Sequence, residues 1–168
     1  MKLRYIILVT VTALVLVLDQ LTKVYVDKSM ALHSSITVIE GFFNITYLRN
    51  KGAAFGILAD SVYRLPFFLL VSSVAVLVIL VVIKRLREDQ KLSAVSLSLI
   101  LSGALGNLID RVRLGEVIDF LDVHWQGHHW PAFNIADSAI CVGVFLLAVE
   151  MLMEERRERK NTPPSVVL

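Results

Sequence analysis

The sequence contains little cysteine and little charge, and both shortages limit what the protein can be. Cys141 is the single cysteine, so no disulfide forms within the chain, and its apolar neighbours favour a packing role over a nucleophilic one. Charged residues are 19% of the 168 residues, and the net charge is +2. The sequence therefore predicts no strongly basic surface, and we expect no nucleic acid among its partners.

Apolar residues, by contrast, are in excess. They make up 56% of the chain, more than the roughly 45–50% of an ordinary soluble domain, and the mean hydropathy is +0.69. Residues 66–83 and 92–109 carry no charge. At about 1.5 Å per residue, each is long enough to cross the hydrocarbon core of a bilayer. Residues 5–25 and 132–149 are similar but carry charges near one end.

These stretches predict an all-α membrane protein that forms a single integral domain over residues 1–168. The expected transmembrane helices cover about residues 5–25, 66–83, 92–110 and 132–152. The first stretch follows Lys2 and Arg4, as the apolar part of a signal peptide would. It ends in LDQLTK rather than in small residues at a cleavage site, so we expect it to be retained as a helix.

Basic residues predict the orientation of the four helices. Lysines and arginines gather before residue 5, in residues 84–91 and after residue 155, and cytoplasmic segments of membrane proteins collect such residues. We therefore expect both termini and the second connection in the cytoplasm. In this arrangement the outer membrane face receives four acidic residues, Asp19, Asp110, Asp119 and Asp137.

The expected outer segments differ from the helices in composition. Residues 35–60 are rich in β-branched and aromatic side chains, which predicts a small β-rich loop region on the outer membrane face. Within it, residues 50–56, NKGAAFG, are typical of a tight turn, where Gly52 and Gly56 allow close backbone approach. Residues 160–168 are predicted to be a disordered tail.

Two acidic residues in apolar surroundings are the first candidates for chemistry. Asp119 lies between Ile118 and Phe120, and Asp137 opens a run without charge. Each has a simpler explanation: a surface acid in a loop for Asp119, and a helix N-terminal residue favoured by the helix dipole for Asp137. However, a carboxylate at the centre of a membrane span costs about 2.5–3.5 kcal/mol, and less near its end. Acids in such places are therefore candidates for a functional site.

One face of the third predicted helix adds to this picture. It carries small and polar residues at i, i+3, i+4 and i+7, namely Gly103, Gly106, Asn107 and Asp110. Small residues alone would indicate close helix packing. Packing does not require an amide, an acid and a guanidinium at one end, which Asn107, Asp110 and Arg111 supply. We expect the glycines to bring helices together while the polar end shapes a site.

Asp19 and Lys23 stand four residues apart near the end of the first predicted helix. This spacing favours an ion pair within the helix. The pair could serve only to neutralise its own charges, and it could equally belong to a site. We expect a supporting role.

Two other classes of membrane protein stay open from these residues. Proton-coupled transporters also place acids in membrane helices, although near the middle of the membrane rather than at one end. A metalloprotease would need ligands such as those in the predicted loop that follows residue 121, Asp122, His124, His128 and His129. No H-E-x-x-H motif is present, and Gly127 and Pro131 interrupt any helix there. We expect no metal and no other cofactor.

Five short motifs resemble those of the bacterial lipoprotein signal peptidases, the signal peptidase II family. They are DQLTK at residues 19–23, NKGAAFG at 50–56, GNLIDR at 106–111, VIDF at 117–120 and FNIAD at 133–137. Each motif alone is weak, but five in this order with four predicted spans are specific. The resemblance covers about residues 5–153, and the histidine-rich segment lies outside its motifs.

The resemblance implies an aspartic endopeptidase of the cytoplasmic (inner) membrane. Enzymes of this family cleave the signal peptide from prolipoproteins before a diacylglyceryl-modified cysteine, at the outer face. By position, Asp119 and Asp137 match the catalytic pair. Residues that match the substrate pocket are Asn50, Gly106, Asn107, Arg111 and Asn134. Residues that match supporting positions are Asp19, Lys23, Gly52 and Asp110. The expected partners are lipidated prolipoproteins and membrane lipids, and we expect a monomer.

Two carboxyl groups are sufficient for this chemistry. One, ionised, takes a proton from the attacking water, and the other, protonated, donates a hydrogen bond to the carbonyl oxygen of the scissile bond. Two carboxylates a few Å apart do not easily ionise together, so the pair shares a proton. The sequence leaves open which of Asp119 and Asp137 is the base.

Overall fold

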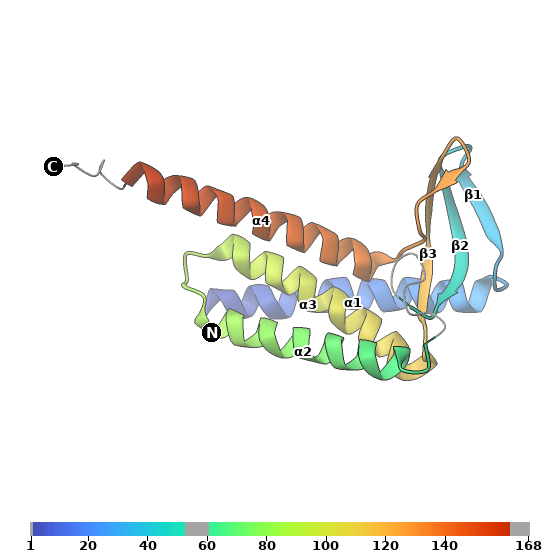
Figure 1. Ribbon diagram of the computed structural model, residues 1–168, viewed down its shortest axis with the longest axis horizontal. Coiled ribbons are helices and arrows are strands. Elements are labelled where there is room, and N and C mark those ends of the chain that lie inside the picture. The colour runs from blue at the N-terminus through green and yellow to red at the C-terminus, as the bar shows by residue number, and fades with distance from the viewer. Residues whose placement is uncertain (1, 53–60, 162–168) are drawn as a thin grey trace.

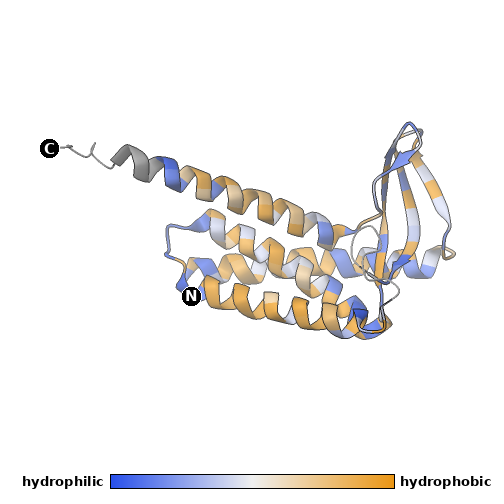
Figure 2. Cartoon of the chain, in the orientation of Figure 1, coloured by the Kyte–Doolittle hydropathy of each residue, from blue (hydrophilic) through white to orange (hydrophobic). Residues whose placement is uncertain are grey.

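Four long helices form the body of the protein (Figure 1). The computed structural model describes residues 2–52 and 61–161. The helices are α1 (Leu3–Ser29), α2 (Arg64–Arg85), α3 (Lys91–Leu114) and α4 (Ile135–Asn161). All four, the last as far as Arg156, are long and apolar enough to cross a membrane. This confirms the predicted fold class, and Figure 2 shows the apolar residues along the helices and polar ones toward their ends.

A small antiparallel sheet lies at one end of the helices, with its strands running across the helix axes (Figure 1). Its strands are β1 (Ser35–Ile39), β2 (Phe43–Asn50), β3 (Val117–Trp125) and β4 (His128–His129), in the order β1-β2-β3-β4. The first two strands lie in the predicted β-rich region. The other two reach into the loop predicted at residues 124–131, and Asp119, for which a loop position was considered, lies in β3.

The strand β3 forms because it pairs with β2. Leu48 lies opposite Asp119, and Asn50 opposite Val117. The helix α3 ends at Leu114. The next residue, Gly115, has a φ of 73° and donates its N–H to the carbonyl of Arg111 at 3.0 Å. Glycine adopts this left-handed conformation without strain. The chain therefore passes almost directly from α3 into β3.

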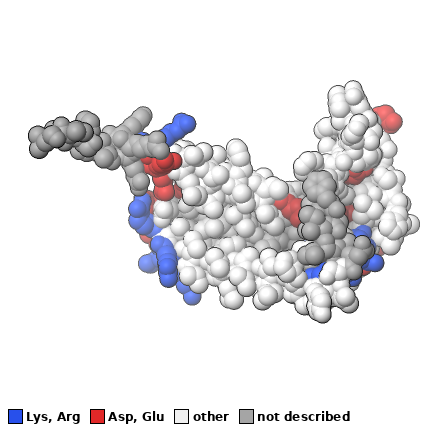
Figure 3. All heavy atoms as spheres, viewed as in Figure 1, with Lys and Arg blue, Asp and Glu red and all other residues white. Residues whose placement is uncertain are grey.

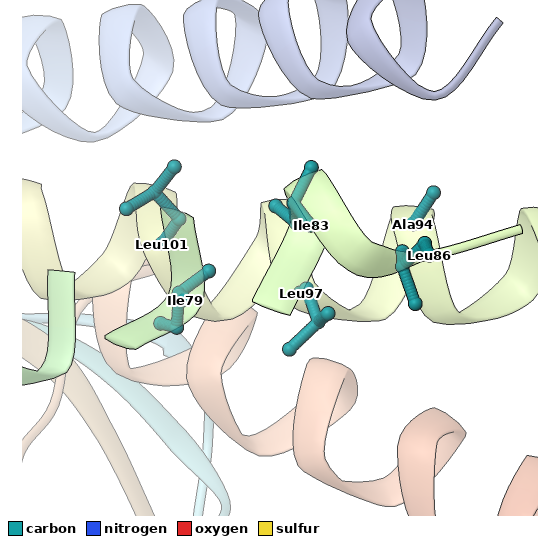
Figure 4. Close-up of a cluster of buried hydrophobic side chains, with 6 residues drawn as sticks. All are labelled: Ile79, Ile83, Leu86, Ala94, Leu97 and Leu101. Carbon is teal, nitrogen blue, oxygen red and sulfur yellow. The ribbon is translucent and has the colours of Figure 1, made fainter. Parts of the chain in front are cut away.

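The helix α3 is the central element of the bundle. In its most apolar window 61% of the residues are buried, compared with 6% to 17% in the other three helices. An apolar cluster packs α3 against α2 at the end remote from the sheet (Figure 4). It consists of Ile79, Ile83, Leu86, Ala94, Leu97 and Leu101. The outer faces of α1, α2 and α4 expose large apolar side chains, as a lipid-facing surface does.

Glycines bring α3 and α4 close together along their contact. A Cβ atom added to Gly103 would lie 2.2 Å from the carbonyl oxygen of Ala136, and one added to Gly143 would lie 2.7 Å from that of Ser96. A real side chain does not tolerate such distances. The expected role of the α3 glycine face in helix contact is therefore seen in the structure.

Element bounds differ from the predicted ones at several places. The fourth span was expected from residue 132, but α4 begins at Ile135, after a short extended segment. Residues 53–56 of the predicted turn at 50–56 lie outside the described residues, as do residues 162–168 of the predicted tail at 160–168. Residues 160 and 161 continue α4.

The contact at Gly103 gives a stability prediction. We expect Gly103→Ala to lower the free energy of unfolding by about 1–3 kcal/mol, because overpacking of a closed contact costs this much. The measurement is thermal unfolding of the purified protein in detergent. Ser73→Leu on the exposed face of α2 adds more volume and should leave the melting temperature nearly unchanged. Equal melting temperatures for Gly103→Ala and wild type would contradict the close contact.

Candidate active site

A cavity of about 460 Å³ opens where the sheet meets the helices. Polar side chains from the end of β2, from α3, from β3 and from α4 line it, and they include Asn50, Asn107, Arg111, Asp119 and Asp137. Apolar groups such as Val117, Phe133 and Ile140 complete the wall. Figure 3 shows acidic atoms in the recess between the helices and the sheet. The structure thus brings both predicted catalytic acids to one pocket.

Asp119 is a buried carboxyl group held by two amides. It is 3% exposed, and its two oxygens accept hydrogen bonds from Asn50 Nδ2 at 2.9 Å and from Asn134 Nδ2 at 2.7 Å. Burial, and then the negative charge of Asp137, raise the pKa of Asp119 to about 7, although both amides favour its ionised form. Asp119 is therefore able to exchange a proton near neutral pH.

Asp137 lies in the first turn of α4 and closes a reciprocal helix cap. The N–H of Asp137 donates to Asn134 Oδ1 at 2.9 Å, and the N–H of Asn134 donates to Asp137 Oδ2 at 3.2 Å. This pairing across three residues is a capping box. The other oxygen of Asp137 accepts a hydrogen bond from Asn107 Nδ2 at 2.7 Å. Asp137 is thus both a helix-capping residue and a pocket residue.

Asn134 connects the two acids and lies behind the pocket. Its side chain is 0% exposed. Its oxygen holds the N–H of Asp137, while its nitrogen donates to Asp119. The sequence predicted a pocket role for this residue but not the bridge. The signal was the spacing N-x-x-D at residues 134–137, which is a variant of the capping box.

A buried ionic cluster lies beside these acids and consists of Asp19, Lys23 and Asp110. The Nζ atom of Lys23 is 3.0 Å from Asp19 Oδ2 and 2.9 Å from Asp110 Oδ2, and all three side chains are at most 1% exposed. The predicted ion pair within α1 is present, and Asp110 from α3 completes it. Lys23 also donates to Asn107 Oδ1 at 3.0 Å.

Each acid of the buried ionic cluster accepts a further hydrogen bond from the backbone. Asp19 Oδ1 accepts the N–H of Ala136 at 2.9 Å, and Asp110 Oδ2 accepts the N–H of Ile118 at 3.3 Å. Gly106 leaves room for this arrangement, since an added Cβ would lie 2.5 Å from Asp19 Oδ2. Gly106 therefore shapes the site from behind the pocket.

Two arginines hold the backbone at the end of β2. Arg111 lies over the ring of Phe68 at 4.7 Å and donates to the carbonyl of Gly52 at 3.3 Å. Arg64, which the sequence analysis did not single out, donates to the carbonyls of Lys51 and Gly115 at 3.1 Å and 3.3 Å. An arginine at the start of α2 and one near the end of α3 therefore hold the segment that follows β2 at the rim of the pocket.

The histidine-rich segment forms a separate polar contact on the sheet. His129 Nδ1 lies 2.8 Å from Asp122 Oδ1, and the rings of His124 and His129 stack with centroids 4.6 Å apart. Asn44 also donates to Asp122 at 2.9 Å. In residues 2–52 and 61–161, no group of three histidines, cysteines or acids is placed to hold a metal ion.

A pocket with paired acids, set at the end of membrane-spanning helices, belongs to the class of membrane-embedded hydrolases. The sequence matches the family described as signal peptidase (SPase) II over residues 11–153. The chain therefore belongs to the signal peptidase II family of aspartic peptidases, and its activity is the cleavage of lipoprotein signal peptides.

Known relatives are similar over nearly their full length. A lipoprotein signal peptidase of Geobacter sulfurreducens is 70% identical over 143 residues, which cover 85% of this chain and 89% of the relative. One of Geobacter metallireducens is 62% identical over 161 residues, 96% and 99% of the two chains. A bacterial membrane enzyme solved by the in meso method superposes with a TM-score of 0.81 at 35% identity, over 95% and 93% of the chains.

The environment of Asp119 gives a titration prediction. We expect its carboxyl group to titrate with a midpoint near 7. Asp137→Asn removes a nearby negative charge and should lower this midpoint, whereas Asn50→Ala removes a hydrogen bond to the carboxylate and should raise it. Infrared difference spectroscopy of the carboxyl band measures the midpoint, and Asp119→Asn identifies the band. A midpoint near the ordinary value of 3.8 in the wild type would contradict this description of the site.

Proposed function

We propose that Asp119 and Asp137 together hydrolyse the peptide bond before the lipid-modified cysteine of prolipoproteins. The observation that carries this proposal is their arrangement, because the two acids come from different elements, line one cavity and are joined by Asn134. An acid pair of this kind supplies both a proton acceptor and a proton donor at one place.

The surroundings of the two acids, burial for Asp119 and a helix N-terminus for Asp137, support a division of roles. Asp137 lies at the N-terminus of α4, where the helix dipole and the N–H of Asn134 favour a negative charge. In this proposal Asp137 is ionised and takes a proton from water, while Asp119 holds a proton and donates a hydrogen bond to the scissile carbonyl oxygen. The water oxygen attacks the carbonyl carbon, and the leaving amine then receives a proton from the pair.

The pocket wall also fits the proposed substrate. Its apolar groups suit side chains of a membrane-embedded signal peptide and the lipid beside the cut. Asn50 and Arg111 carry N–H donors at the rim, and the fork of Arg111 offers several donors in fixed directions. In this proposal they hold backbone carbonyl groups of the precursor near the two acids.

The proposed location is the inner membrane, with the pocket at its outer face and both termini in the cytoplasm. Basic residues support this orientation, because Lys84 and Arg85 end α2 on the side opposite the sheet. We also propose that residues 1–168 act as one domain and as a monomer that binds lipidated prolipoproteins and membrane lipids and needs no cofactor.

The acid pair is tested by substitution. We expect Asp119→Asn and Asp137→Asn each to lower the cleavage rate by at least about 10²–10⁴-fold, because general acid–base catalysis contributes this much. The measurement is a gel-shift time course with purified protein and a lipidated precursor. A matched precursor without the diacylglyceryl group should be cleaved far more slowly by the wild type.

Asp122→Asn is the matched control, since Asp122 lies on the same strand and contacts Asn44 and His129. It should cleave at nearly the wild-type rate. Near-normal turnover by either Asp119→Asn or Asp137→Asn would remove that residue from the mechanism. Equal rates on the two precursors would show that the enzyme does not read the lipid.

Orientation is tested by labelling. In a Cys141→Ala background, we expect cysteines placed at Ser35 and His128 to react with a membrane-impermeant thiol reagent added outside, because both positions are exposed near the sheet. A cysteine at Asp89, in the connection between α2 and α3, should react only after the membrane is permeabilised. The reverse pattern would place the pocket in the cytoplasm.

A further inference from the structure

The buried ionic cluster is costly for a membrane protein. Asp19 and Lys23 lie in α1 and Asp110 lies in α3, and none is more than 1% exposed. Charged groups in such places are expensive even when paired. Elsewhere α3 packs against its neighbours with apolar side chains and glycines instead. The further contacts of the cluster indicate what it does.

Its two acids hold the backbone beside the two proposed catalytic residues. Asp19 accepts the N–H of Ala136, the residue before Asp137, at 2.9 Å. Asp110 accepts the N–H of Ile118, the residue before Asp119, at 3.3 Å. Gln20 links the two acids, because its Nε2 atom lies 3.1 Å from Asp19 Oδ2 and 3.3 Å from Asp110 Oδ1. One cluster thus fixes both β3 and α4 where the pocket begins.

Lys23 adds a directional constraint. An ammonium group has only donors, so the side-chain oxygen of Asn107 must face it, at 3.0 Å. The nitrogen of the same amide then points to Asp137 and donates to it at 2.7 Å. The same oxygen also accepts a hydrogen bond from Asn134 Nδ2, at the longer distance of 3.3 Å. Without the ammonium group, this longer contact would be left to set the orientation of the Asn107 amide.

We propose that the buried ionic cluster positions the proposed catalytic aspartates, and that Lys23 does so by setting the orientation of the Asn107 amide toward Asp137. This inference rests on the proposed function of the two aspartates. Lys23 is a positioning residue here, because it acts on Asp137 through Asn107. If the cluster served only to join helices, substitutions in it would change the stability of the protein but not the rate of the chemical step.

The central experiment replaces the charge by an apolar chain of similar length. We expect Lys23→Met to lower kcat by on the order of 10²-fold, the effect of about 1 Å of misplacement, with KM for the lipidated precursor changed less than about twofold. Lys28→Met, at an exposed position of the same helix, should leave both constants unchanged. A raised KM with an unchanged kcat would overturn the inference.

A double-mutant cycle tests the path through Asn107. If Lys23 acts by orienting this amide, the effects of Lys23→Met and Asn107→Ala on kcat should not add, because both remove the same interaction. Lys23→Met and Arg111→Ala should add. Fully additive effects of the first pair would show that Lys23 does not act through Asn107.

A direct readout comes from Asp119. Burial sets the pKa of this residue high, and the charge of Lys23 is among the influences that lower it. In Lys23→Met the infrared titration midpoint of Asp119 should therefore move upward, while Lys28→Met should leave it in place. An unchanged midpoint in Lys23→Met would contradict the electrostatic contact.

A charge-matched variant serves as the control for an effect on folding. Lys23→Met with Asp110→Asn keeps the net charge of the cluster at that of the wild type and keeps an oxygen for the N–H of Ile118. We expect it to melt near the wild type but to retain the low kcat. Wild-type kcat in this variant would refute the orienting role. If the proposed function itself were wrong, Asp119→Asn or Asp137→Asn would cleave the precursor at the normal rate. That result differs from each outcome given for Lys23→Met.

Discussion

The contact of Lys23 with Asp19 and Asp110 is the constraint on which the outer end of the protein depends. In an apolar surrounding each of these acids would be costly alone, and the shared ammonium group lets both remain in place. Asp19 then accepts the N–H of Ala136 in α4 with its other oxygen, and Asp110 accepts the N–H of Ile118 in β3 with the oxygen that also faces Lys23. Four elements, α1, α3, β3 and α4, therefore meet at one ionic contact beside the pocket.

The two ends of the bundle are held by different physics. At the end remote from the sheet, Ile83 and Leu97 belong to an apolar cluster, and apolar contacts have little dependence on direction. Between helices in a membrane, however, apolar burial supplies little driving force. At the end beside the sheet, amides, carboxylates and one ammonium group make contacts that depend on direction as well as distance. Precision is therefore concentrated where Asp119 and Asp137 must be placed, and the rest of the bundle supports it.

Features that depend on residues close together in the sequence could be predicted, and those that depend on contacts between distant residues could not. The helices and the first two strands are local patterns of hydropathy and β-branched residues, and the sequence predicted them. The strand β3 was missed because VIDFLDVHW has two acids and no clean alternation, and it becomes a strand only through pairing with β2. Asp119 and Asp137 could be recognised because each is an acid in apolar surroundings. For the bridge through Asn134, the N-x-x-D spacing indicates the half that caps α4. The other half, the hydrogen bond to Asp119, depends on how β3 packs beside the start of α4 and has no local signal.

The helix cap at Asp137 has a consequence for turnover. In its ionised form this residue completes the capping box with Asn134, and a negative charge at a helix N-terminus stabilises the helix by about 0.3–1 kcal/mol. If Asp137 takes up the proton of the attacking water, the first turn of α4 loses part of that stabilisation until the proton leaves. The chemical cycle and the local stability of one helix end would then rise and fall together, so the wall of the pocket would be loosest in the step that precedes product release.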